Sequence, residues 1–189
     1  MLRYYITDRH TIGGLAALFE NIERQILAGV DWIQLREKDL TTPQLLDLAR
    51  RVVQRAGQTR VLINSRLDVA MATGAHGVHL PSHSPPPSEF KRVAPHLIVG
   101  VSCHNRAELL AAKREGADYA VLGPVFPPRS KKKLEGMPIG LGQFAELART
   151  VRLPVIALGG ITPETIPACE RAGAAGVAGI SLFQDQGIE

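Results

Sequence analysis

Ala28-Gly29-Val30-Asp31 ends one predicted helix and starts one predicted strand, and a joint of the same form recurs three times along the chain. The glycine of each joint suits the left-handed backbone that commonly follows a helix. Because the joints precede every second predicted strand, the repeating unit is a pair of strand–helix modules. The other three joints are Thr73-Gly74-Ala75-His76, Glu115-Gly116-Ala117-Asp118 and Ala172-Gly173-Ala174-Ala175.

Between the joints, short apolar runs alternate with segments whose apolar residues have helical spacing. Near-continuous apolar strands separated by helices indicate parallel strands buried on both faces. Residues 1–189 are therefore predicted to form a single α/β domain, a TIM (β/α)8 barrel. An open doubly wound sheet is the alternative, which the absence of a Gly-x-Gly-x-x-Gly turn after the first strand disfavours. Strands are expected to begin near Tyr4, Trp32, Val61, Gly77, Ile98, Tyr119, Pro154 and Gly176, and helices to cover residues 15–27, 43–55, 66–73, 88–94, 106–115, 142–150 and 163–172.

Start signals support several of these helices. Thr42 and Thr162 each precede a proline, which suits the first position of a helix. Ser65 is a candidate cap for the next helix, and Asn105 with Glu108 has the spacing of a capping box.

The end of the chain is short for a complete barrel. Only residues 182–189 follow the last predicted strand, so the eighth helix is expected to be short or missing. Outward apolar side chains around Tyr5 and Val177 would then be uncovered, and a partner subunit is expected to cover them. The predicted state is a homodimer.

Composition limits the class of protein. The chain has 45% hydrophobic residues and a formal net charge of +4, with its cations scattered except for Arg129 and Lys131-Lys132-Lys133. This favours a local anion site over a nucleic-acid face. The chain contains no run of eighteen apolar residues, so no membrane span is predicted. Cys103 and Cys169 have neither metal-ligand nor disulfide spacing, so a cytoplasmic location is expected.

A polar row follows the first joint. In the predicted strand of Trp32-Ile33-Gln34-Leu35-Arg36-Glu37-Lys38, Gln34, Arg36 and Lys38 point to one face and Ile33, Leu35 and Glu37 to the other. The row is expected to face a cavity that binds an anionic ligand. In the alternative interpretation, Gln34 and Arg36 pair internally with Glu37 or Asp8.

Further polar residues follow other strands at the same end of the predicted barrel, where such enzymes carry their active sites. Gly159-Gly160 and Gly179-Ile180-Ser181 suit a phosphate site built from backbone N–H groups. His104 lies on the same side of its strand as Ser102 and is the candidate proton-transfer residue, with His83 as its rival. His79, which alternates inward, is interpreted as a hydrogen-bonded core histidine rather than a base.

The motifs together resemble the thiamine phosphate synthase and TenI superfamily over nearly the whole chain. The matching segments are Gln34-Leu35-Arg36-Glu37-Lys38, Asn64-Ser65-Arg66-Leu67-Asp68-Val69-Ala70, Gly77-Val78-His79-Leu80, Gly100-Val101-Ser102, Gly123-Pro124-Val125-Phe126 and the strand that ends in Gly159-Gly160.

The resemblance implies a barrel that binds a thiazole phosphate and, in the synthases, a pyrimidine pyrophosphate with magnesium. The residues it assigns to the pyrophosphate side are Gln34, Arg36, Lys38, Asn64 and Lys131, with Ser102 as a further ligand residue. Those it assigns to the thiazole phosphate are Ser130, Gly159, Gly160, Ile180 and Ser181.

Three positions depart from the family patterns. Synthases carry magnesium-binding aspartates where this chain has Ser65 and Ser84, and neutral hydroxyls are poor magnesium ligands. The segment Leu80-Pro81-Ser82-His83-Ser84 looks like the TenI branch, whose thiazole tautomerases move a proton without metal. That branch tends to have a histidine where this chain has Pro124.

The leading hypothesis is therefore a TenI-like thiazole tautomerase that needs no cofactor. A thiamine phosphate synthase, which would require Mg²⁺, is the first alternative. A non-catalytic barrel that binds thiamine-pathway phosphates is the second.

Overall fold

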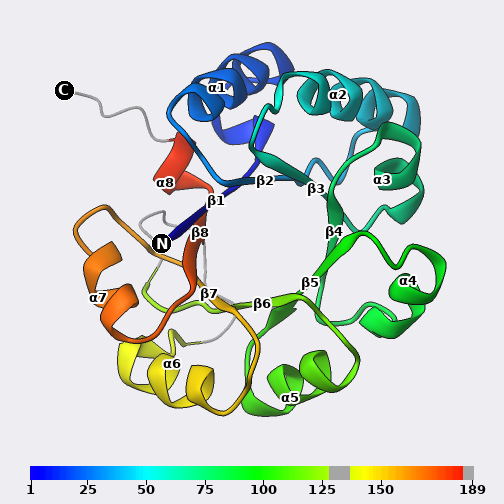
Figure 1. Cartoon of the computed structure of the whole chain (residues 1–189). Helices are drawn as coiled ribbons and strands as arrows, with labels where there is room; N and C mark the ends of the chain where they lie inside the picture. The colour runs from blue at the N-terminus through cyan, green and yellow to red at the C-terminus, as the bar shows by residue number, and fades with distance from the viewer. Residues whose placement is uncertain (128–136, 185–189) are drawn as a thin grey trace.

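The chain folds as a closed barrel of parallel strands in sequence order, β1 to β8. The computed structural model describes residues 1–127 and 137–184. Because β1 also pairs in parallel with β8, the sheet has no free edge. The predicted TIM barrel is confirmed (Figure 1). The strands are β1 (Leu2–Ile6), β2 (Trp32–Leu35), β3 (Arg60–Asn64), β4 (Gly77–Leu80), β5 (Ile98–Cys103), β6 (Tyr119–Leu122), β7 (Val155–Leu158) and β8 (Gly176–Gly179).

Helices surround the strands as an outer ring (Figure 1). None in the described part of the chain is long and apolar enough to cross a membrane. The helices are a short 3-10 helix η1 (Arg9–Thr11), α1 (Leu15–Leu27), α2 (Thr42–Arg55), α3 (Leu67–Thr73), α4 (Pro87–Val93), α5 (Arg106–Arg114), α6 (Gly140–Arg149), α7 (Ile166–Arg171) and α8 (Ser181–Gln184).

The helix starts were predicted with mixed success. The box before α5 is confirmed, since Asn105 Oδ1 accepts from the Glu108 N–H at 3.0 Å. The cap of α2 is Thr41 instead of Thr42, and its N–H donates to Gln44 Oε1. Helix α7 begins at Ile166 instead of Pro163, because residues 162–165 form a separate turn closed by the Thr165 N–H and the Thr162 carbonyl (3.0 Å).

Alternation along the strands produces two layers of core. Ile33 and Leu35 point outward and pack in the layer beneath the helices. Gln34, between them, points into the barrel, where it bonds to Asn64. The predicted division is therefore confirmed for Ile33, Gln34 and Leu35, whereas the strand ends at Leu35 and Arg36, Glu37 and Lys38 follow it outside the strand.

The predicted open patch around Tyr5 and Val177 is wrong. These side chains are 0% and 1% exposed, because the single turn of α8 covers this part of the barrel. The Phe183 ring lies 5.5 Å from that of Tyr5. Gln184 Oε1 accepts from the Tyr5 hydroxyl (3.1 Å) and from the Asp8 N–H (2.9 Å). The eighth helix is short, as expected, but its anchored side chains seal the gap without a partner subunit.

Candidate active site

Gln34 and Asn64 join the carboxyl ends of β2 and β3 inside the barrel. Gln34 is 1% exposed, and its Nε2 donates to Asn64 Oδ1 at 2.9 Å. Its Oε1 has no hydrogen-bond partner within residues 1–127 and 137–184. An unpaired buried amide oxygen destabilises a protein by about 1–3 kcal/mol. Gln34 Oε1 is therefore a candidate acceptor for an N–H or O–H group of a bound ligand.

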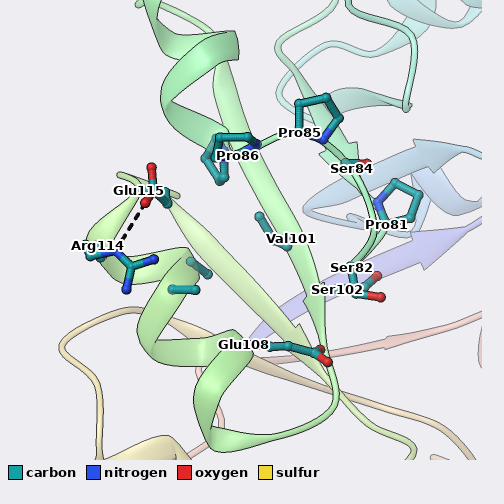
Figure 2. A pocket seen from close by; sticks show the side chains of 13 residues that line it. Pro81, Ser82, Ser84, Pro85, Pro86, Val101, Ser102, Glu108, Arg114 and Glu115 are labelled. Carbon is teal, nitrogen blue, oxygen red and sulfur yellow. Dashed lines mark hydrogen bonds and ion pairs between the residues drawn. The ribbon is translucent and has the colours of Figure 1, made fainter.

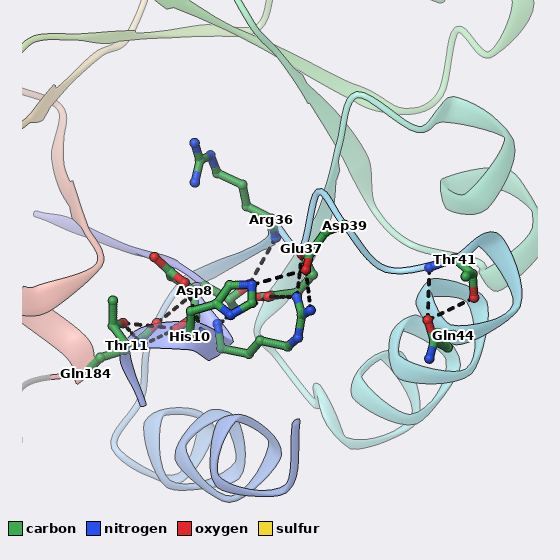
Figure 3. A network of polar contacts seen from close by, with 11 residues as sticks. Asp8, His10, Thr11, Arg36, Glu37, Asp39, Thr41, Gln44 and Gln184 are labelled. Atoms are coloured by element: carbon green, nitrogen blue, oxygen red, sulfur yellow. Dashed lines mark hydrogen bonds and ion pairs between the residues drawn. The ribbon is translucent and has the colours of Figure 1, made fainter. Parts of the chain in front are cut away.

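Arg9 pairs with the two carboxylates that follow β2, those of Glu37 and Asp39, which are labelled in Figure 3. Its guanidinium lies 3.2 Å from Glu37 Oε2 and 2.6 Å from Asp39 Oδ1. Hydrogen bonding to Arg9 holds the pKa of Asp39 well below its usual range. Glu37, which is buried, also accepts from Thr7 Oγ1 at 2.7 Å. A buried carboxylate requires such pairing, and here Arg9 supplies it.

This pairing leaves Arg36 and Lys38 for a ligand. In the described part of the chain, neither side chain forms an ion pair with a carboxylate. Figure 3 shows the Arg36 side chain directed away from the Arg9–Glu37–Asp39 network. The alternative in which Glu37 pairs with Arg36 is therefore wrong. Arg36 and Lys38 follow Gln34 along the chain, and Gln34 bonds to Asn64, which lines one pocket with Lys38. These four residues, Gln34, Arg36, Lys38 and Asn64, are named here the cationic subsite.

A pocket of about 300 Å³ lies beside this subsite. It brings together Lys38, Asn64, Ser65 and His83, which the sequence analysis had singled out from three separate segments. Leu35, Glu37, Leu40, Leu45, Arg66 and Pro81 complete its lining. The volume suits a small ligand group such as a phosphate.

Ser65 is not a helix cap. Arg66 occupies the N-cap position of α3, and the backbone of Ser65 is left-handed, with φ of 61°. Its N–H donates to the His79 carbonyl (2.9 Å), and its Oγ accepts from Asn64 Nδ2 (3.0 Å). These two hydrogen bonds, and no capping interaction with α3, hold Ser65 at the edge of the cationic subsite.

Ser84 lies in a different pocket, of about 240 Å³, between the β4–α4 loop and α5 (Figure 2). Ser82, Ser102 and Glu108 also line this pocket.

The donor set of these two pockets does not fit magnesium. Within the described residues, no group of three histidine, cysteine, aspartate or glutamate side chains gathers around one point. Glu37 and Asp39 are held by Arg9, and Asp68 pairs with Arg66 at 2.6 Å. In the pocket that contains Ser84, Glu108 bonds to His104 and Asn105, and Glu115 pairs with Arg114. The Ser65 and Ser84 hydroxyls are neutral, whereas Mg²⁺ prefers carboxylate and phosphate oxygens.

The two candidate proton-transfer histidines lie in different surroundings. His104 Nδ1 lies 3.0 Å from Glu108 Oε2, and the His104 N–H donates to the same oxygen at 2.8 Å. The Glu108 carboxylate at the start of α5 thus holds the ring, and the role of His104 in proton transfer stays a prediction. His83 is exposed and lines the pocket that contains Lys38.

His79 is a hydrogen-bonded core residue, as predicted. It is 3% exposed, with Nδ1 bonded to the Tyr119 hydroxyl and Nε2 to Ser102 Oγ, each at 2.9 Å. Burial, with the nearby charge of Arg36, lowers the pKa of His79 to about 3. The ring is therefore neutral at ordinary pH.

The predicted phosphate residues form a second subsite at the ends of β7 and β8, named here the glycine subsite: Gly159, Gly160, Ile180 and Ser181. Both glycines have positive φ, 100° and 61°. A Cβ on Gly160 would lie 2.3 Å from the Pro127 carbonyl oxygen, so the chain must be glycine here. The predicted residues Ser130 and Lys131 lie outside the described residues.

A closed (β/α)8 barrel that gathers polar side chains and left-handed glycines at the carboxyl ends of its strands has the architecture of a (β/α)8-barrel enzyme. A sequence profile of one such family, TMP-TENI, described as thiamine monophosphate synthase, matches residues 3–183. The chain belongs to this family, and the prediction of an enzyme is confirmed.

Relatives with similar sequences carry synthase names. A putative thiamine-phosphate synthase 2 of Aquifex aeolicus is 45% identical over 182 residues, which cover 95% of this chain and 96% of that protein. A putative thiamine-phosphate synthase of Geobacter sulfurreducens is also 45% identical, over 95% of this chain and 85% of its own. The solved structure of thiamine phosphate pyrophosphorylase from Pyrococcus furiosus has a TM-score of 0.86 and 30% identity, covering 98% of this chain and 88% of that chain.

These names do not support the TenI-like branch that the segment around His83 indicated. The superfamily was predicted correctly, whereas the assignment to the tautomerase branch has no support among these relatives.

Proposed function

We propose that the protein is a thiamine-phosphate synthase that joins a pyrimidine pyrophosphate to a thiazole phosphate. In this reaction the bond between the pyrimidine methylene carbon and the pyrophosphate oxygen breaks, and the thiazole nitrogen forms the new C–N bond. Pyrophosphate leaves with the electron pair of the broken bond. The observation that carries the proposal is the pair of cations, Arg36 and Lys38, that no protein carboxylate neutralises in the described residues.

The two subsites divide the work of this reaction. Arg36 and Lys38 would hold the pyrophosphate and stabilise the negative charge that develops as it leaves. The unpaired Gln34 Oε1 would accept a hydrogen bond from the pyrimidine and so fix its orientation. The backbone of Gly159 and Gly160 would bind the thiazole phosphate from the opposite side of the mouth.

The proposed reaction does not use Mg²⁺, because the side chains that line the two pockets do not fit this ion. Two aspartates with one Mg²⁺ carry no net charge, and neither do two serines without metal. The serines at positions 65 and 84 therefore leave the net charge around the pyrophosphate unchanged, provided that the metal is absent too.

The test is product formation by the purified protein. With both substrates, thiamine phosphate and pyrophosphate should appear together, and chromatography with a pyrophosphate assay would measure them. Assays with added Mg²⁺ and with a chelator determine whether the reaction needs metal. No thiamine phosphate under either condition would contradict the proposal.

The tautomerase hypothesis is the second candidate, because Ser65 and Ser84 would suit a reaction without metal. Against it stand Pro124 and the engagement of His104 by Glu108. Conversion of a thiazole carboxylate phosphate faster than in buffer, with no synthase activity, would favour it. Tight phosphate binding with neither activity would favour the non-catalytic barrel.

A homodimer and a cytoplasmic location stay predictions. The homodimer was predicted because an apolar gap was expected around Tyr5 and Val177. Helix α8 closes this gap, so a dimer would have to form through another surface. Light scattering of the purified protein tests it directly.

A further inference from the structure

A chain of hydrogen bonds runs through the barrel interior to the mouth. The hydroxyl oxygens of Tyr4 and Tyr119 are 2.8 Å apart, and Tyr119 continues to Nδ1 of His79 at 2.9 Å. Nε2 of His79 then reaches Ser102 Oγ, also at 2.9 Å. Four strands, β1, β6, β4 and β5, each contribute one member. Ser102, the outermost member, lines the pocket shown in Figure 2.

A glycine in β5 provides the space that this chain of hydrogen bonds needs. Gly100 pairs in register with both His79 and Tyr119, and a Cβ at Gly100 would lie 1.9 Å from Tyr119 Cζ. Only glycine therefore lets the Tyr119 ring lie across β5. The ring is also held by edge contacts with Trp32 (4.9 Å between centroids) and Tyr4 (5.8 Å). Packing on several sides fixes its hydroxyl at the imidazole.

All four groups of the hydrogen-bond chain are neutral at ordinary pH. Burial raises the pKa of both tyrosines and lowers that of His79 to about 3. The two phenols, the imidazole and the serine therefore carry one mobile hydrogen each. Three contacts use three of these four hydrogens. The fourth is left on Ser102, on Tyr4, or on Tyr119 if that hydroxyl accepts from both of its neighbours. Tyr119 is 1% exposed, so a hydrogen left there would be an unpaired buried donor.

Only one direction leaves that hydrogen in a favourable place. If the hydrogen-bond chain donates inward, the hydrogen of the Tyr4 hydroxyl is left over, and in the described residues this hydroxyl has no partner other than that of Tyr119. Tyr4 is 0% exposed, so water does not reach this hydrogen, and an unpaired buried donor is unfavourable. If the chain donates outward, the leftover hydrogen belongs to Ser102, which is partly exposed at the mouth.

We propose that Tyr119 and His79 are positioning residues that make the Ser102 hydroxyl a one-way hydrogen-bond donor toward the ligand. Tyr119 donates to Nδ1, the Nε2–H of His79 donates to Ser102 Oγ, and the serine hydrogen points into the site. The ligand atom opposite Ser102 is then an acceptor, such as an unprotonated ring nitrogen or an anionic oxygen. The role of this contact in substrate binding rests on the proposed function; the direction of the chain does not.

The direction can be measured in the free protein. Nitrogen-15 NMR of labelled histidine rings distinguishes a protonated from an unprotonated ring nitrogen, and His79→Gln assigns the signals. The expected result between pH 6 and pH 8 is a protonated Nε2 and an unprotonated Nδ1 that do not titrate. A protonated Nδ1 would overturn the proposal. The measurement needs neither ligand nor turnover, so it stands even if the synthase activity is not found.

Two phenylalanine variants test the consequence for binding. Tyr119→Phe removes the donor to Nδ1, so His79 is no longer held in its Nε2–H tautomer and Ser102 no longer donates only toward the ligand. The KM for pyrimidine pyrophosphate should then rise about three- to tenfold, with kcat changed less than about twofold. Tyr4→Phe removes a hydroxyl from the same aromatic cluster but leaves the bond from Tyr119 to His79. It should keep the wild-type tautomer and KM.

Equal increases in KM for the two variants would show that the hydroxyls serve packing alone and would contradict the proposal. If Tyr119→Phe folds poorly because it orphans the Tyr4 hydroxyl, the double variant Tyr4→Phe/Tyr119→Phe removes both groups. Its KM should match the value expected for Tyr119→Phe, and a wild-type KM would contradict the proposal.

Discussion

The cationic subsite and the glycine subsite lie at the same end of one barrel and are built in different ways. In the first, the proposed binding depends on side chains: within the described residues Arg36 and Lys38 pair with no carboxylate, because Arg9 holds the neighbouring Glu37 and Asp39. In the second, binding depends on backbone: Gly160 lies against the Pro127 carbonyl with no room for a Cβ. Side-chain sites can change their chemistry by substitution without losing the fold, whereas a backbone site cannot. This difference explains how Ser65 and Ser84 can depart from the synthase pattern while Gly159 and Gly160 keep it.

The largest effect is expected at the glycine subsite. Gly160→Ala would place a Cβ 2.3 Å from the Pro127 oxygen and 2.8 Å from Phe126 Cβ, at a φ of 61°. Stability should fall by about 2–3 kcal/mol in urea unfolding, and affinity for thiazole phosphate should fall with it. Gly142→Ala is the matched control, since its Cβ meets nothing within 4 Å inside α6. It should raise stability by up to about 1 kcal/mol, and equal losses in the two variants would contradict the backbone explanation.

The cationic subsite should show the reverse pattern. Arg36→Ala and Lys38→Ala should each weaken pyrophosphate binding about 10- to 100-fold in calorimetry, because each removes a charge-assisted contact. Stability should change by less than about 0.5 kcal/mol, since neither cation pairs with a carboxylate in the described structure. Arg55→Ala, which breaks a surface pair with Glu23 (2.7 Å), controls for the loss of one positive charge. A large loss of stability with unchanged affinity would make Arg36 and Lys38 structural residues.

The serines test how far the cationic subsite can be altered. In Ser65→Asp/Ser84→Asp, pyrophosphate affinity without metal should fall about tenfold through like-charge repulsion, and Mg²⁺ should restore it. Asparagine at both positions controls for size without charge and should bind like wild type. Calorimetry with and without Mg²⁺, corrected for the binding of Mg²⁺ to pyrophosphate itself, measures the difference. A wild-type protein that already requires Mg²⁺ would contradict the absence of a metal site.

The smallest effect is expected at His104. His104→Ala removes a contact with Glu108 at the start of α5, so stability should fall by no more than about 1 kcal/mol and turnover should change less than twofold. His83→Ala, within the pocket that contains Lys38, is the informative partner. Steady-state kinetics of both variants under one set of conditions compares them. Loss of turnover in His104→Ala alone would restore its predicted role in proton transfer.

Sequence alone determined the barrel, its strand order and the inward face of β2, because these follow from local periodicity. Apolar spacing predicted α1 at residues 15–27, and a period of two predicted Gln34 inward between Ile33 and Leu35. Glycine joints and capping residues act over a few residues, so they can be recognised in a single sequence.

Tertiary structure decided which polar groups meet across the barrel. Nothing near Arg9 in the sequence indicates that it pairs with Glu37 and Asp39, which lie 28 and 30 residues away. The closure of the gap over Tyr5 by Phe183, which is distant in the sequence, also depends on positions in space. Local periodicity fixes the face on which a side chain lies, but the partner of a charge or hydroxyl is chosen by distance and burial after the chain has closed.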